Sequence, residues 1–344
     1  MITVLLVGMR EETREVLRTT LDAERDLAVV GETGDADEVP RLMRKTRPDV
    51  VLLGTGQALG AAELTRRLMN EMPVPVLVMA SEVAGAEAFD ALRQGAIDIL
   101  PARDQFSPAQ ATQLARSVRA AAGVKLLRKG LSRTTPAAAS IDGAIVGIGA
   151  STGGPPALAL ILGALGPEFP APILLVQHMV DGFIGQFVEW LSTAIRLCVK
   201  VAANGEMPVP GTVYVAEGGH LALDVKGRIE ILDRPPVDGL RPAANVLFES
   251  LARAGWARRI GVLLTGMGED GASGLKALRD AGGHTLAQDE ATSVVFGMPK
   301  SAIERGAVDE VVALENIAPR LVELVGSGAA GRRGRTSSRS MDQP

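Results

Sequence analysis

The sequence predicts an α/β protein with two domains, and three observations lead to this fold class. The chain has 344 residues, whereas a typical domain has about 150. Both halves alternate short apolar, β-branched runs with helical patterns, which is typical of parallel strands joined by helices. Residues 123–140 mix basic, Ser/Thr, Pro and Ala residues without a strand period, as linkers do. We therefore expect domains at 1–122 and 141–326, a linker at 123–140 and a disordered tail at 327–344.

The N-terminal part of the chain predicts a parallel sheet that is covered by helices on both faces. Its apolar runs, which we interpret as strands, are ITVLLVG, LAVVGE, DVVLLG, PVLVMA and IDIL. The helical patterns between and after these runs span Glu11–Asp22, Val39–Thr46, Ala61–Met72, Ala84–Gln94 and Pro108–Ala122.

The second half predicts a doubly wound, mostly parallel α/β sheet. Its apolar runs are AIVGIGAS, PILLVQH, TVYVAE, HLALDV, RIEILD, RIGVLLTG and HTLAQD. Short runs meet across Gly218-Gly219 and across Lys226-Gly227, and glycine-containing turns of this kind join antiparallel strands. We therefore expect antiparallel hairpins inserted into this sheet.

Composition and charge disfavour several classes of protein. The net charge is −4, so the basic surface of a nucleic-acid-binding protein is not expected. The single cysteine, Cys198, excludes an intramolecular disulfide, and three widely spaced histidines do not suggest a structural zinc site. No apolar run approaches the roughly 18 residues of a membrane span, and the opening residues lack the basic region of a signal peptide. We expect a cytoplasmic protein that is not inserted in a membrane.

Candidate catalytic residues follow three of the predicted strands. Ser151 comes after AIVGIGA, His178 after PILLVQ and Asp270 shortly after RIGVLLTG. Open α/β sheets bind ligands beyond the carboxyl ends of their strands. A serine needs a base to become nucleophilic, a histidine can take its proton, and a carboxylate can orient the imidazole. The three strand ends therefore predict a Ser-His-Asp triad.

Each of these residues also has a structural interpretation. Ser151 and Asp270 precede predicted helices, where N-capping is the commonest role of Ser and Asp. His178 could be a structural histidine at a strand end. We interpret His220 and His284, which open apolar runs after Gly-Gly pairs, as structural residues.

The glycines near Ser151 suggest a competing function. Gly147, Gly149 and Gly153 follow the spacing of a dinucleotide-binding turn only in part. In such a unit the second strand ends in an acidic residue that binds ribose, whereas here it ends in Gln177-His178. A dinucleotide cofactor is therefore not expected.

Four longer motifs resemble a known family. IGASTGGP, LLVQHM, LTGMGEDGASGL and AQDEATSVVFGMP, in this order and spacing, look like the catalytic domain of the chemotaxis receptor methylesterases, the CheB family. GTVYVAEGGHLAL and RPPVDGLRPAANVLFESLA resemble further family segments, so the likeness covers about 141–325. The first half resembles the flavodoxin-like receiver domain that precedes the esterase in this family.

The resemblance implies a reaction and partners. It places the nucleophile on Ser151, the base on His178 and the orienting acid on Asp270, with an oxyanion and substrate loop at Thr152 and Met267. The implied reaction is hydrolysis of glutamate γ-methyl esters, with deamidation of glutamines, on the cytoplasmic helices of chemoreceptors. A chemotaxis histidine kinase is a further candidate partner, and neither a metal nor a cofactor is implied. A serine esterase of another substrate and a non-catalytic signalling adaptor remain the alternatives.

The esterase half departs from the family pattern in one short stretch. Leu240-Arg241-Pro242-Ala243 stands where family members usually carry His-Arg-Pro-Ser, and Asn245 stands where they carry Asp. These differences affect how a receptor helix is held and leave the predicted triad unchanged.

The receiver-like half lacks the groups that bind Mg²⁺ and carry a phosphoryl group in active receivers. Gly8-Met9 replaces the acidic pair after the first strand, and Gly54 replaces the phospho-accepting Asp after the third. The fourth strand ends in Ala80-Ser81, with the serine one residue late, and the segment IDILPARD contains no lysine. We expect a receiver-like fold that binds no Mg²⁺, accepts no phosphoryl group and acts as a fixed cover or docking surface over the esterase site.

Overall fold

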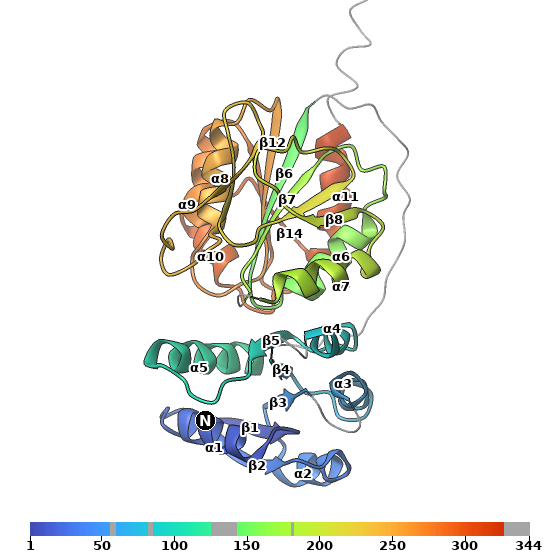
Figure 1. Ribbon diagram of the computed structural model, residues 1–344, viewed down its shortest axis with the longest axis vertical. Helices are drawn as coiled ribbons and strands as arrows, with labels where there is room; N and C mark the ends of the chain where they lie inside the picture. Colours follow the sequence, from blue (N-terminus) through green and yellow to red (C-terminus); the bar gives the residue numbers. More distant parts are fainter. Residues whose placement is uncertain (56–59, 82–84, 125–142, 180–181, 327–344) are drawn as a thin grey trace, which may run out of the picture.

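The computed structural model describes residues 1–55, 60–81, 85–124, 143–179 and 182–326. Figure 1 shows an N-terminal half and a C-terminal half, each built around its own sheet. Most of the expected linker and the whole expected tail lie outside the described residues, so the domain limits stay a prediction.

The N-terminal half contains a five-stranded sheet in the order β2-β1-β3-β4-β5. All of its pairs are parallel, and this strand order is that of the flavodoxin-like folds. The strands are β1 Ile2–Val7, β2 Leu27–Thr33, β3 Val50–Gly54, β4 Val76–Ala80 and β5 Asp98–Pro101. Strands β3 and β4 are buried along their whole length, as their uninterrupted apolar sequences predict.

The helices of this half begin and end close to the predicted residues. They are α1 Glu11–Asp22, α2 Val39–Thr46, α3 Ala61–Glu71, α4 Gly85–Arg93 and α5 Pro108–Ala122, with a short 3₁₀ helix at Ala36–Glu38 that the sequence patterns did not predict. The start of α5 has a clear chemical cause, because Ser107 and Gln110 form a capping box around Pro108 at the first helical position.

The C-terminal half contains a seven-stranded sheet in the order β14-β13-β12-β6-β7-β9-β8. All of its pairs are parallel. The strands are β6 Ala144–Ala150, β7 Ile173–Gln177, β8 Cys198–Val201, β9 Thr212–Val215, β12 Arg258–Leu263, β13 His284–Gln288 and β14 Glu310–Val312. The edge strands β8 and β14 were not predicted, because each is only three or four residues long, is partly exposed and includes a charged residue.

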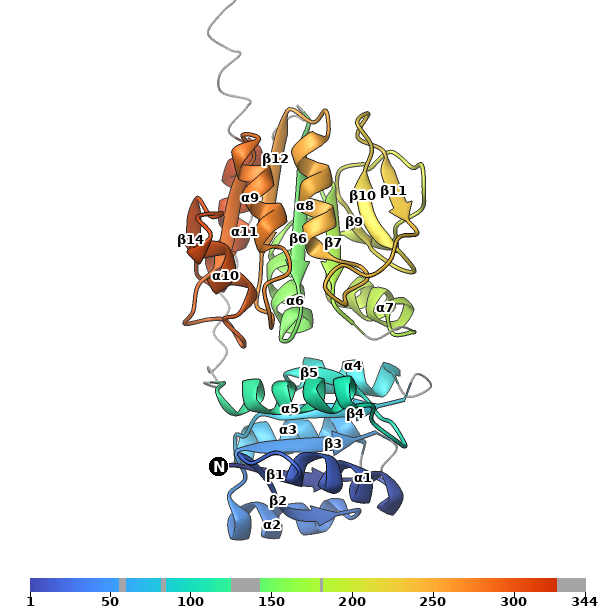
Figure 2. The same cartoon turned by 90° about the vertical axis from the view of Figure 1, so that its left-hand side faces the viewer.

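Helices cover both faces of this sheet, as expected for a doubly wound fold. One face carries α8 Ala244–Arg253, α9 Ala272–Asp280 and α10 Met298–Glu304 (Figure 1). The other carries α6 Gly154–Ala164, α7 Ile184–Ala194 and α11 Leu314–Gly326. Because the seven strands are parallel, the loops that follow them lie at the end of this sheet nearest the N-terminal half (Figure 2).

One predicted hairpin is present and the other is wrong. Strands β10 His220–Leu223 and β11 Ile229–Leu232 pair antiparallel across Lys226-Gly227, but they form a separate two-stranded sheet. Strand β9 does not turn back at Gly218-Gly219; it stays in the main sheet, parallel to β7 and β8. The reason is that β9 is buried along its whole length, and such a strand belongs inside a parallel sheet rather than in a surface hairpin.

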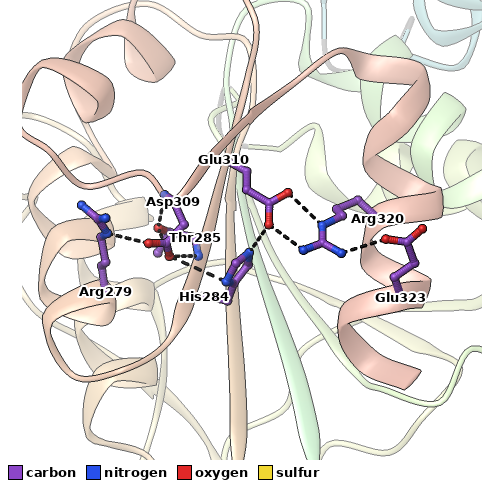
Figure 3. Close-up of polar contacts among 7 residues, drawn as sticks. All are labelled: Arg279, His284, Thr285, Asp309, Glu310, Arg320 and Glu323. Atoms are coloured by element: carbon purple, nitrogen blue, oxygen red, sulfur yellow. Dashed lines mark hydrogen bonds and ion pairs between the residues drawn. The ribbon is translucent and has the colours of Figure 1, made fainter. Parts of the chain in front are cut away.

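A network of ion pairs ties β14 to the rest of the half, as Figure 3 shows. Glu310 on β14 binds Arg320 of α11 at 2.7 Å and His284 of β13 at 2.6 Å, and Asp309 binds Arg279 of α9 at 2.7 Å. His284 is the first residue of β13, at the end of the sheet opposite to the strand ends that carry the candidate triad. Its position supports the structural interpretation.

The two halves pack on each other through aromatic residues. Phe89 of α4 lies 6.1 Å from Phe187 and 5.7 Å from Trp190 of α7, measured between ring centroids. Arg93 of α4 donates a hydrogen bond to the Thr193 hydroxyl at 3.2 Å. Figure 2 shows α4, β5 and α5 on the side of the N-terminal half that faces the C-terminal half.

Candidate active site

The three candidate catalytic residues follow three adjacent strands. In the order β12-β6-β7, Asp270 follows β12, Ser151 follows β6 and His178 follows β7. The His178 amide donates to the Ala150 carbonyl at 2.9 Å, and the Ser151 amide donates to the Thr265 carbonyl at 3.1 Å. The strand ends that the sequence singled out are therefore joined by backbone hydrogen bonds.

His178 and Asp270 form the polar centre of the site. The Nε2 atom of His178 lies 2.8 Å from Oδ2 of Asp270, and the two side chains are 9% and 3% exposed. Burial favours the neutral form of the Asp270 carboxyl, but the hydrogen bond and charge of His178 and two backbone amides outweigh it and hold the pKa of Asp270 below its ordinary value. A charged Asp270 stabilises an imidazolium at His178.

The backbone around Ser151 explains why this serine caps no helix. Helix α6 starts at Gly154, its N-cap residue is Gly153 in the left-handed conformation at φ 77°, and no side chain caps it. A Cβ atom at Gly153 would lie 2.5 Å from Cβ of Val294, and one at Gly154 would lie 2.1 Å from Oε1 of Gln177. Glycine is therefore required at both positions, and the turn leaves the partly exposed Ser151 hydroxyl without a capping role.

The local N-cap interpretation of Asp270 is also wrong. Helix α9 has Gly271 as its N-cap residue and no side-chain cap. Instead, Asp270 accepts hydrogen bonds from the first two amides of α8, Ala244 at 2.6 Å and Asn245 at 3.0 Å. Asp270 thus holds the start of a helix that lies 26 residues earlier in the sequence.

Two backbone amides beside Ser151 are available to bind an oxyanion. A Cβ atom at Gly266 would lie 2.7 Å from Cβ of Ser151, so the Gly266–Gly268 loop lies against the serine. Within the described part of the chain, the amides of Thr152 and Met267 donate no hydrogen bond. Acyl hydrolases stabilise the tetrahedral intermediate with backbone amides that have no other acceptor, so Thr152 and Met267 stay the predicted oxyanion donors.

The side chain of Gln177 joins the nucleophile and base segments, a role that the sequence analysis missed. Its Nε2 atom donates to the Ser151 carbonyl at 3.0 Å and to the His178 carbonyl at 2.9 Å. The residue is 1% exposed. Only the position of Gln177 at the strand end beside His178 could have pointed to this role.

We expect Gln177→Leu to lower the turnover number by roughly 10- to 100-fold, because small displacements of reacting groups have effects of this size. The substitution keeps most of the volume but leaves the Ser151 and His178 carbonyls without their shared donor. Steady-state rates of ester hydrolysis, the reaction that the sequence resemblance implies, will measure the effect. Gln94→Leu, at an exposed position, serves as the control, and equal rates for the two variants would contradict a role for Gln177.

The glycines that suggested a cofactor turn have another function. Gly147 and Gly149 lie inside β6 rather than in a turn. A Cβ atom at Gly147 would lie 2.4 Å from Cδ1 of Leu251, and one at Gly149 would lie 2.9 Å from Cβ of Ala244. These glycines let α8 pack closely on the sheet, which explains their presence without a dinucleotide-binding turn.

The N-terminal half contributes to the walls of the site. A cavity of about 270 Å³ beside His178 is lined by Met179, by residues 239–242 and by Arg103, which follows β5. The carboxyl of Asp98 of β5 lies close to the side chain of Thr152, the residue after Ser151. Asp98 retains some exposed surface, yet protein atoms surround its carboxyl, and this burial raises its pKa to about 7.

The burial of the Asp98 carboxyl beside Thr152 makes docking of the two halves depend on pH. The docked state keeps a proton on Asp98 up to about pH 7, whereas a solvated Asp releases it near pH 4. Docking is therefore strongest below pH 4 and weakens as the pH rises from about 4 to about 7. We expect the radius of gyration from X-ray scattering to be larger at pH 8 than at pH 5.

Asp98→Asn should remain compact at both pH values, because the amide stays neutral and keeps its oxygen toward Thr152. A variant with the same pH response as the unaltered protein would contradict this role for Asp98.

Comparisons with known proteins place the chain in a family. The sequence profile described as CheB methylesterase matches residues 146–321. Protein-glutamate methylesterase/protein-glutamine glutaminase 2 of Anaeromyxobacter dehalogenans is 43% identical over 334 residues, which cover 94% of this chain and 97% of that protein. The chain belongs to the CheB methylesterase family. The match includes the N-terminal half as well as the catalytic half.

Other members of the CheB family agree with this assignment. Protein-glutamate methylesterase/protein-glutamine glutaminase 1 of Syntrophus aciditrophicus is 38% identical over 351 residues, covering 96% of this chain and all of that protein (100%). The crystal structure of the Thermotoga maritima CheB methylesterase catalytic domain is 40% identical, covers 53% of this chain and 99% of that chain, and gives a TM-score of 0.50. In the described residues of this CheB-family protein, no helix is long and apolar enough to cross a membrane.

Proposed function

We propose that this CheB-family hydrolase removes methyl groups from glutamate γ-methyl esters, and deamidates glutamines, on the cytoplasmic helices of chemoreceptors. The observation that carries the proposal is the hydrogen-bonded pair of His178 and Asp270 at the strand end beside Ser151. The relatives, which are named protein-glutamate methylesterase/protein-glutamine glutaminase, supply the substrate class. The protein would act in the cytoplasm, where these receptor helices lie.

The proposed mechanism gives each residue a role that agrees with this geometry. Nε2 of His178 is engaged by Asp270, so Nδ1 is the nitrogen that takes the Ser151 proton. The structure has no hydrogen bond between the Ser151 hydroxyl and this imidazole, and such contacts commonly tighten only when substrate binds. Asp270 holds the ring by its hydrogen bond and stabilises the imidazolium that forms.

The reaction has two steps that use the same groups. Ser151 Oγ attacks the ester carbonyl, the tetrahedral intermediate collapses, and the methoxy group leaves as methanol with the proton from His178. Water then gives a proton to His178 and attacks the acyl-enzyme, which releases the glutamate carboxylate and restores Ser151. A glutamine substrate follows the same course with ammonia as the leaving group. An amide donor such as Met267 typically contributes about 3 kcal/mol of transition-state stabilisation.

The substrate class can be tested directly. A chemoreceptor cytoplasmic fragment carrying radiolabelled methyl esters is incubated with the full-length protein, and released methanol is measured. A small activated ester is assayed in parallel. Rapid release from the receptor fragment supports the proposal, whereas hydrolysis of the small ester alone would favour a serine esterase of another substrate. No hydrolysis of either would favour a non-catalytic adaptor.

We also propose that the N-terminal half accepts no phosphoryl group. Gly54 ends the buried strand β3, and a Cβ atom there would lie 2.6 Å from Cγ of Met9 and 2.7 Å from the Gly8 carbonyl oxygen. The space that a phospho-accepting side chain needs is thus filled by Met9. Arg10 and Asp104, at the same end of the sheet, pair at 3.5 Å. A histidine kinase would then be only a docking partner of this half.

The control of activity follows from this proposal. Because Arg103 lines the cavity beside His178, the docked N-terminal half acts as a cover over the esterase site that phosphorylation does not move. We expect beryllofluoride with Mg²⁺ to leave methanol release by the full-length protein unchanged. A fragment beginning near Ser140 should be more active than the full chain. Activation of the full-length protein by beryllofluoride would overturn the proposal.

A further inference from the structure

We propose that His220 is a positioning residue for the esterase reaction, because it holds the start of α8 against Asp270. The inference rests on the proposed function, since it concerns the same triad. His220 is the first residue of β10 and is 0% exposed. The sequence pattern around it suggested only a structural histidine.

The two ring nitrogens of His220 have different partners, and these partners fix its tautomer. The Ala243 amide donates to Nδ1 at 3.1 Å, and Nε2 lies 3.1 Å from the Pro235 carbonyl oxygen. An amide can only donate and a carbonyl can only accept, so Nδ1 is unprotonated and Nε2 carries the hydrogen. The imidazole is therefore neutral in this structure and fully satisfied.

The contact with Ala243 extends the hydrogen bonds that Asp270 makes. Ala243 is the N-cap residue of α8 and has no side-chain group that can cap the helix. His220 binds the Ala243 amide, and Asp270 binds the next two amides, at Ala244 and Asn245. Three successive amides at the start of α8 thus bind two buried side chains, and the Asp270 carboxylate also orients His178.

This arrangement couples His220 to the base. Oδ2 of Asp270 accepts from both the Ala244 amide and His178, so a shift of the α8 start moves the atom that orients the imidazole. A residue that only stabilised the fold would change unfolding without changing the turnover of the folded enzyme. A positioning residue changes turnover and the His178–Asp270 hydrogen bond together.

Two substitutions test the contacts of the two His220 ring nitrogens one at a time. His220→Asn places its amide oxygen where Nδ1 lies and can still accept from Ala243, whereas His220→Gln places its amide nitrogen near Nε2 and keeps only the contact with Pro235. We expect His220→Gln to lower kcat for methanol release roughly 10- to 100-fold with little change in KM. His220→Asn should retain kcat within about threefold of the unaltered enzyme, since the contact that matters is kept.

The matched control is Ser250→Ala. Ser250 is 2% exposed and also joins β10 to α8, since its hydroxyl accepts from the Leu223 amide at 3.0 Å and donates to the Leu247 carbonyl at 2.7 Å. It touches none of the amides that bind Asp270. We expect Ser250→Ala to lower the Tm and leave kcat unchanged. Equal losses of kcat in Ser250→Ala and His220→Gln, or full kcat in folded His220→Gln, would overturn the proposal.

Nuclear magnetic resonance supplies a readout that needs no substrate. The downfield proton between His178 and Asp270 should shift in His220→Gln and stay in place in Ser250→Ala. The nitrogen-15 shifts of the unaltered protein should show His220 protonated at Nε2 alone, and protonation at Nδ1 would overturn the proposal even if no variant folds. These signals report on the positioning of His178 even if the receptor fragment is not the substrate. A failure of the proposed function can therefore be distinguished from a failure of the proposed role of His220.

Discussion

Ser151→Ala is expected to abolish methanol release from a methylated receptor fragment while the fold remains intact. Loss of the nucleophile of a serine triad commonly lowers turnover by roughly a millionfold. The Ser151 hydroxyl caps no helix, so its removal should not destabilise α6. Released radiolabelled methanol measures the loss, and circular dichroism with thermal unfolding checks the fold.

The control for this prediction is Ser192→Ala, in which an exposed serine that bonds only to its own helix is removed. It should leave turnover unchanged. Retention of more than about one per cent of activity by Ser151→Ala would contradict a serine mechanism, since residual catalysis by the rest of a triad is far smaller.

Asp270→Asn should have the second largest effect, because the proposed mechanism and the start of α8 both depend on the Asp270 carboxylate. The neutral amide cannot stabilise an imidazolium, and loss of the triad carboxylate commonly lowers turnover by about 10⁴-fold. The amide nitrogen cannot accept from an N–H group, so at least one bond to the start of α8 or to His178 is lost. Loss of such a helix cap costs about 1 kcal/mol, which lowers the Tm by a few degrees.

The pH dependence of the Tm tests separately whether the Asp270 carboxylate stabilises the fold. Because its folded pKa lies below the ordinary value, its stabilising contribution is present at neutral pH and is lost as the pH falls below about 4. Asp270→Asn should therefore reduce the loss of Tm on acidification. A variant with unchanged turnover and the same acid response as the unaltered protein would show that Asp270 has neither role.

Periodicity predicted much of the fold because buried elements carry continuous patterns. Helices α1, α2 and α5 begin and end at the predicted residues, where an amphipathic stripe or a capping residue marks the limit. Sequence periodicity did not predict elements that are held in place by contacts with distant parts of the chain. Strand β14 is held by ion pairs to α11 and β13, and its three residues carry no period of their own.

In the candidate site, too, local sequence indicated some residues, whereas residues that depend on distant contacts were missed. Ser151, His178 and Asp270 could be proposed from the sequence because each follows an apolar run, which local sequence reveals. Gln177 and His220 were not assigned to the site, because their partners are backbone groups at Ser151 and Ala243, and a backbone group has no signature in the sequence. The bonds of Asp270 to α8 were missed for the same reason.

The position of Met9 also bears on how this protein could change by mutation. Replacing Gly54 with Asp would not by itself restore an acceptor, because the new Cβ atom would lie 2.6 Å from Met9 and 2.7 Å from a backbone oxygen. Replacing Met9 first would leave an unfilled hole in the core cluster to which that side chain belongs, and such holes are destabilising. Each single substitution is therefore unfavourable alone, so an acceptor at position 54 would require coordinated changes at Gly54 and Met9.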